Sequence, residues 1–271
     1  MRVALTGASG FIGRNLCAEL QRTGHDVLPL ARGYDAGILH GFNPEWIFHV
    51  AAEIYQEDKM FASNVSLTYA LLQATADIDY KAFVYVGSSS EYGRKSKPMS
   101  ETDCLSPTTM YEATKACGSL LCQAVARARG KPIVIARPFS VYGMYEPEHR
   151  LIPRLFQAAN TGAAIKLSHA VHDFIYIDDV VRALLLIAEN PISGDIVNLG
   201  TGTMTSNIEA ALTVERATGK HIHSEVIDEK LREFDSAYWC CDPQHAVDAY
   251  KFTAGYSLNE GLCAHERRRA A

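Results

Sequence analysis

A tyrosine and a lysine stand four positions apart in the segment YEATK, as Tyr111 and Lys115. Residues four apart lie on the same face of a helix, so the two side chains can act together. An ammonium beside a phenol favours the phenolate and lowers the pKa of the phenol from its ordinary value of about 10. Tyr111 can then exchange a proton with a hydroxyl or carbonyl group near neutral pH. The spacing predicts an acid–base pair, although two ordinary polar residues on a helix surface would show it too.

A run of serines ends the segment FVYVGSSSEYG, which precedes Tyr111 in the chain. The apolar residues before the serines predict a buried strand, and ligands bind at the carboxyl ends of the strands of a parallel sheet. A hydroxyl group at this place can hold the substrate oxygen with which Tyr111 exchanges its proton. Serines at a strand end can also simply cap the chain.

Three glycines follow the first apolar segment at a spacing of three residues, Gly7, Gly10 and Gly13. A tight turn at this place delivers free backbone N–H groups to the start of a helix, where the helix dipole favours a pyrophosphate. The segment therefore predicts a dinucleotide site. The alternative is a glycine-rich turn that binds no ligand.

Strand-like and helix-like segments alternate through the first half of the chain. The alternation predicts an α/β fold with a doubly wound parallel sheet of the Rossmann type. We expect residues 1–143 to form the dinucleotide-binding core, completed by about 173–200, and residues 144–172 and 201–271 to form a smaller C-terminal substrate-binding lobe. The expected strands are 2–7, 25–32, 44–52, 81–90, 131–140 and 195–202, and the expected helices are 11–24, 64–76, 110–130 and 150–162, with a strand followed by a helix in 172–190.

The composition restricts the partners. The 271 residues carry a formal net charge of −5, which gives no general attraction to nucleic acid or to an anionic membrane. No apolar run approaches the roughly 20 residues that span a bilayer, and glycines interrupt the first residues too early for a signal peptide. The seven cysteines suit neither a disulfide framework nor a metal site, so we expect a reducing, cytoplasmic setting and no metal.

The end of the second strand bears on the choice of dinucleotide. Sites for NAD usually carry an acidic residue there, which binds the ribose hydroxyls. This chain has Ala31 at that position and Arg32 beside it. A guanidinium can pair with a 2′-phosphate, which favours NADP(H), unless Arg32 is an exposed residue without a ligand. Asp35 is close enough in the chain to keep NAD(H) possible.

Motifs along nearly the whole chain resemble those of one family. They are, in order, TGASGFIG, PEWIFHVAA, the asparagine of NVSLTYALLQA, FVYVGSSSEYG, PMSETDCLSPTTMYEATK, ARPFSVYG, HDFIYIDDV, NLGTG and AYWCCDPQHA. The chain resembles the extended short-chain dehydrogenases/reductases, and within them the NAD(P)-dependent nucleotide-sugar epimerase, dehydratase and reductase group. The segment between Arg32 and PEWIFHVAA is shorter than the helix and strand that this family usually has there.

The resemblance implies roles for individual residues. It places Ser88 at the catalytic serine or threonine position beside Tyr111 and Lys115. The cofactor-binding residues that it implies are Gly7, Gly10, Phe11, Ile12, Gly13, Arg32, Ala51, Ala52, Asn64, Tyr111, Lys115 and Phe139. The substrate-binding residues that it implies are Ser89, Ser90, Ser140, His172 and Arg232. Ser140 stands where the family often has asparagine and His172 where it often has arginine, which suggests an altered nucleotide-sugar substrate.

Three reactions use this machinery in the family. Epimerases remove hydride from the sugar and return it to the other face, dehydratases also expel a hydroxyl, and reductases consume NADPH to reduce a keto-sugar. The usual dehydratases carry glutamate two residues after the catalytic serine, where this chain has Ser90, although a local shift would bring in Glu91.

The pair of Ala31 and Arg32 makes NADPH-dependent reduction of a 4-keto-6-deoxy sugar nucleotide the favoured reaction. An NAD-dependent epimerase and, after it, a dehydratase stay open. A non-catalytic regulator that senses NADP(H) is a further alternative, against which the set of Ser88, Tyr111 and Lys115 argues.

The resemblance also implies a homodimer. In the family, the helices that correspond to residues 64–76 and 111–129 form a four-helix interface between two subunits. Ala70, Ala74, Leu121 and Val125 are the small and apolar residues that we expect to face outward from these helices. The alternative is that these residues only face the sheet.

Overall fold

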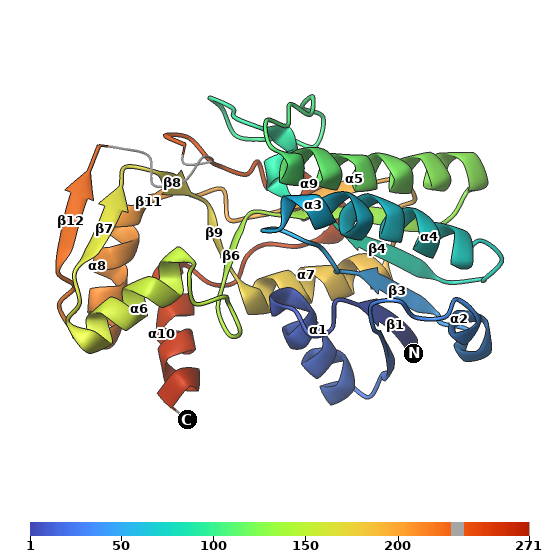
Figure 1. Ribbon diagram of the computed structural model, residues 1–271, viewed down its shortest axis with the longest axis horizontal. Helices are drawn as coiled ribbons and strands as arrows, with labels where there is room; N and C mark the ends of the chain where they lie inside the picture. The colour runs from blue at the N-terminus through green and yellow to red at the C-terminus, as the bar shows by residue number, and fades with distance from the viewer. Residues whose placement is uncertain (229–235, 271) are drawn as a thin grey trace.

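One parallel sheet organises the computed structural model, which describes residues 1–228 and 236–270 (Figure 1). The strand order is β10-β5-β4-β3-β1-β2, and all neighbouring strands are parallel. The prediction of a doubly wound Rossmann-type sheet is confirmed. The strands are β1 (Arg2–Thr6), β2 (Asp26–Leu30), β3 (Trp46–His49), β4 (Ala82–Val86), β5 (Ile133–Pro138) and β10 (Ile196–Leu199).

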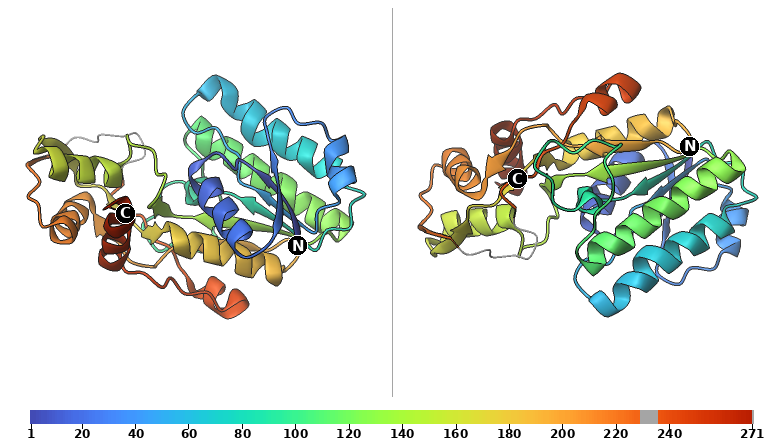
Figure 2. Two further views of the ribbon diagram at one scale, coloured as in Figure 1. Left: turned by 90° about the horizontal axis from the view of Figure 1, so that it is seen from below. Right: turned by 90° about the horizontal axis from the view of Figure 1, so that it is seen from above.

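Helices cover both faces of this sheet because alternate strand residues point to opposite faces. Val3 and Leu5 of β1 belong to the core under α1 and α7, whereas Ala4 belongs to the core under the other helical layer (Figure 2). The first layer is α1 (Phe11–Arg22) and α7 (Ile177–Glu189); the second is α2 (Gly37–Phe42), α3 (Glu57–Met60), the π-helical segment η1 (Phe61–Ser66), α4 (Leu67–Ala74) and α5 (Met110–Arg129). In the described ranges, no helix combines the length and apolarity that crossing a membrane requires.

Of the elements that follow β5, α7 covers the sheet, β10 joins it and α9 packs against β10, whereas the others build a second group beside the sheet (Figure 1). Three two-stranded sheets pair β6 with β9, β7 with β12 and β8 with β11. The division of the chain into two domains stays a prediction. The elements of this group are β6 (Ser140–Tyr142), α6 (Leu151–Thr161), β7 (Ile165–Ser168), β8 (Val171–His172), β9 (Phe174–Tyr176), β11 (Thr205–Ser206), α8 (Asn207–Thr218), β12 (Ser224–Ile227) and α10 (Leu258–Ala270). The helix that packs against β10 is α9 (Gln244–Tyr250).

The sheet ends at β2, because the chain passes from β2 to β3 through only the short helix α2. Every residue between these two strands is described, and none of them forms a further strand. Pro29 lies within β2 and cannot donate a ladder hydrogen bond, which an edge strand tolerates. The short segment that the sequence indicated after Arg32 thus leaves β2 at the edge.

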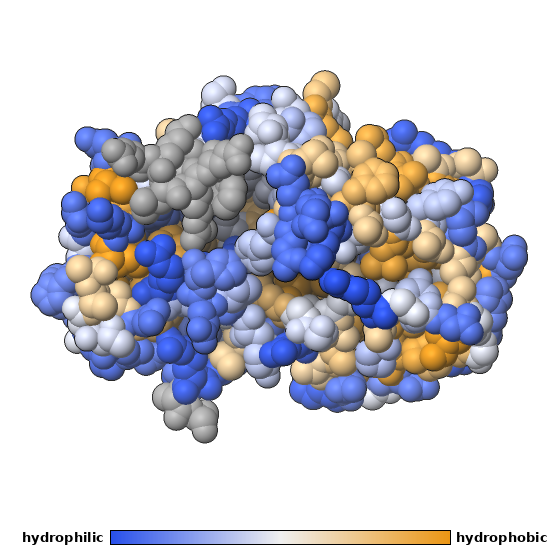
Figure 3. All heavy atoms as spheres, viewed as in Figure 1, coloured by the Kyte–Doolittle hydropathy of each residue, from blue (hydrophilic) through white to orange (hydrophobic). Residues whose placement is uncertain are grey.

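The outward face of α4 and α5 differs from the one predicted. Ala70 is exposed, but Ala74, Leu121 and Val125 are half-buried and pack against the core, so the prediction that these three face outward is wrong. Their helix positions point them toward the sheet rather than away from it. The exposed apolar side chains here are larger, namely Phe61 on η1, Tyr69 on α4, and Met110 and Leu120 on α5, and Figure 3 shows apolar residues gathered over α4 and α5.

A buried histidine connects the ends of β1 and β3 to the helical layer. His49 Nδ1 lies 2.7 Å from Thr6 Oγ1, and its Nε2 lies 2.9 Å from Thr68 Oγ1. Thr68 Oγ1 donates to the carbonyl of Asn64, so it accepts from Nε2–H, and Nδ1 accepts from Thr6. Both ring nitrogens are therefore satisfied by neutral imidazole. Burial, together with the nearby charge of Lys115, lowers the pKa of His49 to about 3.

This histidine should make the fold sensitive to acid. Its folded-state pKa lies below the unfolded value of 6.5, so protons favour the unfolded chain, and stability falls as the pH drops below 6.5 toward 3. Between about pH 7 and about pH 5, we expect His49 to contribute a loss of about 2 kcal/mol in the free energy of unfolding.

Urea denaturation at both pH values measures this loss. His49→Gln should be less stable at neutral pH and should lose about 2 kcal/mol less on acidification than the wild type. His40→Gln, at an exposed position of α2, serves as the matched control and should behave as the wild type does. An equal pH dependence in the wild type and His49→Gln would contradict the prediction.

Candidate active site

The glycine loop forms a close-packed cradle at the start of α1. Gly7 adopts a φ of +73°, and a Cβ on it would lie 2.7 Å from the backbone nitrogen of Ala51. A Cβ on Gly13 would lie 2.0 Å from the carbonyl oxygen of Gly7. Gly10 caps α1 without a side-chain hydrogen bond, and no acidic residue follows in the first turn, which includes Phe11 and Ile12. These features fit the pyrophosphate of a dinucleotide, which would lie against the α1 N–H groups.

Asn64 holds the loop that follows β3. Its Oδ1 accepts from the Glu53 N–H at 2.7 Å, and its Nδ2 donates to the Glu53 carbonyl at 2.9 Å and to Thr114 Oγ1 at 3.0 Å. Ala51, whose N–H donates to Thr6 Oγ1, and Ala52 stand at the start of this loop beside Gly7. The prediction that Asn64 binds the cofactor stays a prediction; in the structure its side chain holds the backbone of this loop at Glu53.

Arg32 lies exposed directly after β2, and an acidic side chain that the sequence reasoning missed lies near it. Three successive N–H groups, those of Ile54, Tyr55 and Gln56, donate to Glu53 Oε1. The Tyr55 N–H has the largest part in holding the pKa of Glu53 below its ordinary value, and the charge of Arg32 adds to it. A carboxylate thus partly offsets the positive charge of Arg32. Its place just after a strand end was the signal that could have identified it.

The three predicted catalytic residues come together at the ends of β4 and α5. Ser88 follows β4, where its Oγ accepts from the Ser90 N–H at 3.1 Å. Tyr111 lies in the first turn of α5, and its phenol is close enough to the Ser88 hydroxyl for that hydroxyl to favour the phenolate. Lys115, one turn later, is buried, donates from Nζ to the Val86 carbonyl at 2.6 Å and lies 4.4 Å from the Tyr85 ring centroid.

Local sequence fixes where this helix begins and ends. Thr109 and Glu112 form a capping box: Thr109 Oγ1 accepts from the Glu112 N–H, and Glu112 Oε2 accepts from the Thr109 N–H. Gly130 ends the helix in the left-handed conformation that glycine adopts without strain. The capping box places Tyr111 at the second position of α5, directly opposite the serine-bearing end of β4.

The electrostatics of the pair differ from the prediction. Burial raises the pKa of Tyr111, while the Ser88 hydroxyl and the charge of Arg150 act in the opposite direction. Burial lowers the pKa of Lys115 to about 8, and its ammonium is directed to Val86 rather than to the phenol. The prediction that Lys115 lowers the pKa of Tyr111 is therefore wrong: burial has the larger effect and raises that pKa.

Two further side chains that the sequence did not indicate reach toward Tyr111. Arg150, at the start of α6, lies 5.9 Å from the Phe11 ring and 3.3 Å from Glu146, and Tyr55 packs its ring against His149 at 4.7 Å. Arg150 and Tyr55 both act electrostatically on the Tyr111 phenol. They come from segments far apart in the chain, and neither lies in a motif, so spacing could not reveal them.

The predicted substrate-binding residues fall into two groups. Ser140 Oγ lies 3.2 Å from His172 Nδ1, because β6 pairs with β9, which begins two residues after His172. Ser89, after β4 in the 3₁₀ segment η2 (Ser89–Tyr92), accepts from Trp239 Nε1 at 3.3 Å, next to Ser90. Phe139, predicted to contact the cofactor, is buried in a cluster with Tyr92, Met99, Trp239 and Cys241. Arg232 lies outside the described residues.

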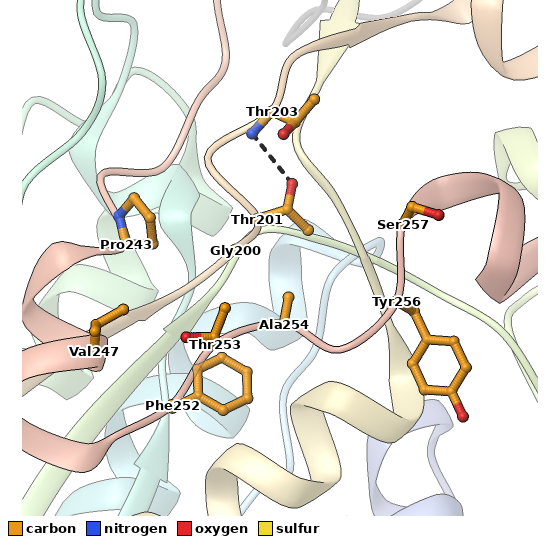
Figure 4. Close-up of a pocket in the computed structure, with 10 residues that line it drawn as sticks. All are labelled: Gly200, Thr201, Thr203, Pro243, Val247, Phe252, Thr253, Ala254, Tyr256 and Ser257. Atoms are coloured by element: carbon orange, nitrogen blue, oxygen red, sulfur yellow. Dashed lines mark hydrogen bonds between the residues drawn. The ribbon is translucent and has the colours of Figure 1, made fainter.

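Asp173, which follows His172 in the chain, carries a buried carboxylate. Asp173 accepts from the N–H groups of Thr201, Gly202 and Cys241 and from the Thr201 hydroxyl. Thr201 also borders a small cavity of about 240 Å³ between the end of β10 and the segment that joins α9 to α10 (Figure 4). Its lining contains none of the predicted site residues, so the cavity is separate from the candidate site.

Comparisons with known proteins agree with this geometry. The family model described as "NAD dependent epimerase/dehydratase family" matches residues 3–200. The uncharacterized UDP-glucose epimerase YtcB of Bacillus subtilis (strain 168) is 29% identical over 307 residues, with 97% of this chain and 96% of the relative covered. The dTDP-6-deoxy-L-talose 4-dehydrogenase (NAD(P)(+)) of Kitasatospora kifunensis is 29% identical over 240 residues, with 76% and 75% covered.

A solved structure, MoeE5 in complex with UDP-glucuronic acid and NAD, is similar along the whole of both chains. It is 29% identical to this chain, its TM-score is 0.89, and 100% of each chain is covered. Because the family match spans residues 3–200 of 271, the chain belongs to the NAD dependent epimerase/dehydratase family.

Proposed function

We propose that this protein is an epimerase of nucleotide-activated sugars that uses a nicotinamide dinucleotide. The observation that carries the proposal is the convergence of Ser88 and Tyr111 at the carboxyl end of β4, one helical turn from the buried Lys115, whose Nζ donates to the Val86 carbonyl. YtcB is named as a UDP-glucose epimerase, and MoeE5 binds UDP-glucuronic acid and NAD, which supports this reaction ahead of the reduction that the sequence favoured.

The side chains of the site suit the transfer of a proton to and from a sugar hydroxyl. A bound oxidised nicotinamide supplies the hydride acceptor and a positive charge. Tyr111, whose pKa burial raises, becomes a base when positive charge is brought close, and takes the hydroxyl proton as hydride leaves the sugar. It returns the proton when hydride comes back to the other face. Ser88 holds the reacting oxygen between its hydroxyl and the phenol.

The position of Glu91 argues against the dehydratase alternative. Its carboxylate is fully buried and accepts hydrogen bonds from the Ser88 N–H, the Ser119 hydroxyl and Arg137. The Glu91 carboxylate is directed into the protein interior rather than into the proposed site. A local shift of the chain would therefore not provide the acid that expels a hydroxyl. Ser90, at the position where the usual dehydratases carry glutamate, cannot replace it.

A reductase is the second candidate, and Arg32 is the observation that favours it. Arg32 follows Ala31 at the end of β2, where an acid would repel a 2′-phosphate and a guanidinium attracts it. The relative from Kitasatospora kifunensis is named as a dehydrogenase that takes NAD(P)(+), which supports a reaction of this kind. On this reading the protein reduces a 4-keto-6-deoxy sugar nucleotide with NADPH.

A homodimer through α4 and α5 is a further part of the proposal. These two helices pack against each other; α4 exposes Tyr69, α5 exposes Leu120, and η1, which leads into α4, exposes Phe61. Their apolar face suits a second copy of the same face, as in the family.

All seven cysteines are free, which supports a reducing, cytoplasmic setting.

Turnover of sugar nucleotides tests the proposed reaction. We expect UDP-glucose or UDP-glucuronic acid to be converted to its epimer, seen by proton NMR, without net change in nicotinamide absorbance. Tyr111→Phe removes the hydroxyl group that carries the transferable proton and should lower the rate roughly 10²–10⁴-fold. Tyr69→Phe, on the exposed face of α4, is the matched control. A Tyr111→Phe rate within a factor of two of the wild type would refute the proton-transfer role.

Cofactor affinities separate the epimerase from the reductase. We expect NAD(H) to bind as tightly as NADP(H), because Glu53 offsets part of the Arg32 charge. Arg32→Ala should weaken NADP(H) roughly tenfold, the effect of losing one charge-assisted contact, and leave NAD(H) unchanged. Arg22→Ala, on α1, is the control. Calorimetric titration that finds NADP(H) at least tenfold tighter in the wild type would favour the reductase instead.

The oligomeric state is measured by light scattering at micromolar concentration. We expect a dimer for the wild type and a monomer for Leu120→Arg, because the substitution places a charge in the centre of the apolar face. Leu212→Arg, at an exposed position of α8, should stay dimeric. A monomeric wild type would reject the interface.

A further inference from the structure

A carboxylate lies completely buried beneath the candidate site. Glu91 is 0% exposed; its Oε1 accepts from the Ser88 N–H at 2.8 Å, and its Oε2 accepts from Ser119 Oγ at 2.7 Å and from Arg137 Nε at 2.9 Å. All three partners donate. Burial raises the pKa of this carboxyl group, but the charge of Arg137 and the hydrogen bonds act in the opposite direction and favour the ionised form.

Gly87 makes room for this carboxylate. A Cβ on Gly87 would lie 2.5 Å from Glu91 Oε1 and 3.3 Å from Ser119 Oγ. The backbone of Gly87 is not in the left-handed region, so the residue is glycine for space and not for conformation. The sequence VGSSSEYG thus carries two matched features, a glycine at the strand end and a glutamate four residues later that fills the space beside it.

Arg137 locks the carboxylate to the sheet. The guanidinium is buried on β5, and it lies 4.6 Å from the ring centroid of Tyr92, whose hydroxyl donates to Asn198 on β10 at 2.8 Å. Removing two charges from water is costly, and a buried ion pair is weak evidence for stability by itself. A role in the site explains why the chain keeps the pair at this place.

The charge of Glu91 reaches the catalytic pair. Burial lowers the pKa of Lys115, and the charge of Glu91 is the largest of the influences that raise it. The same charge also raises the pKa of Tyr111. The titratable and charged groups that face Glu91 are Arg137 from β5, Lys115, Tyr111 and Cys122 from α5, Tyr85 from β4 and Tyr92 from its own segment.

We infer that Glu91 is a positioning residue for the proposed reaction: its carboxylate fixes the backbone of Ser88 and supplies the buried negative charge opposite Lys115 and Tyr111. It acts through these residues and does not touch the substrate. The inference rests on the proposed function only for the reaction that Ser88, Tyr111 and Lys115 carry out. The effect of the Glu91 charge on Tyr111 can be measured without a substrate.

The titration of Tyr111 measures that electrostatic part. The near-ultraviolet absorbance of phenolate, taken as the difference between a protein and its own Tyr111→Phe variant, reports this one tyrosine. In Glu91→Gln the midpoint should fall by roughly one pH unit, because a nearby negative charge has been removed. Glu209→Gln is the matched control, since Glu209 accepts from the Ser206 N–H at 2.8 Å in the same kind of cap on α8. Its Tyr111 midpoint should not move.

The pH profile of turnover gives a second readout. With a sugar nucleotide that reacts, both limbs of the kcat profile should move to lower pH in Glu91→Gln, the acid limb through Tyr111 and the alkaline limb through Lys115. Glu91→Asp keeps the charge and shortens the side chain, so it should lower kcat and leave the limbs in place. A purely structural role would lower kcat in both variants without moving either limb.

Glu91→Gln leaves Arg137 without its partner, so Glu91→Gln/Arg137→Gln is measured as well. Two amides replace the ion pair there, and circular dichroism verifies that each variant is folded. A Tyr111 midpoint that does not move in either folded variant overturns the inference. A shifted midpoint in a protein that converts no sugar nucleotide supports the charge of Glu91 and counts against the proposed function alone.

Discussion

The buried ammonium of Lys115 is the contact on which the arrangement of the site depends. It donates to the Val86 carbonyl at the end of β4 and lies over the Tyr85 ring, so it ties α5 to the central strand of the sheet. Tyr111 lies one turn earlier on the same helix and therefore meets Ser88, which directly follows that strand. A desolvated ammonium needs nearby negative charge or dipoles, and Val86 and Glu91 provide them from two sides.

A second chain of hydrogen bonds joins the glycine loop to the same helix. Thr6, the last residue before Gly7, contacts His49, His49 contacts Thr68, and Thr68 donates to the carbonyl of Asn64. The Asn64 side chain then donates to Thr114, the neighbour of Lys115. The loop that fits a pyrophosphate and the helix that carries the proposed acid–base pair are thus held by one buried polar network, which fixes their separation.

Regular elements and the local motifs could be predicted from the sequence because each has a short-range signal. The Tyr111 and Lys115 spacing, the glycine turn before α1 and the serines after β4 all lie in the expected elements. The electrostatics could not be predicted in this way, because burial raises the pKa of Tyr111 and no pattern in YEATK reports burial.

Contacts between distant segments were also beyond the sequence. Arg150 and Tyr55 approach Tyr111 from loops that only the fold brings together. Ala74, Leu121 and Val125 were assigned to the wrong face because small and apolar residues occupy both faces of a helix that packs against another helix. The sequence left open that a local shift brings Glu91 to the position of a dehydratase acid, since a sequence alone cannot distinguish a carboxylate that points into a site from one buried beneath it.

The central claim is that one hydride leaves a sugar carbon and returns to the same molecule. The fate of deuterium in a UDP-hexose labelled at the reacting carbon tests it most directly, with the wild-type protein and unlabelled UDP-hexose present together. The account predicts that the epimeric product keeps the deuterium at that carbon and that the unlabelled molecules gain none. Loss of the label to water, or its accumulation in the nicotinamide pool with a keto-sugar as the product, would contradict the account.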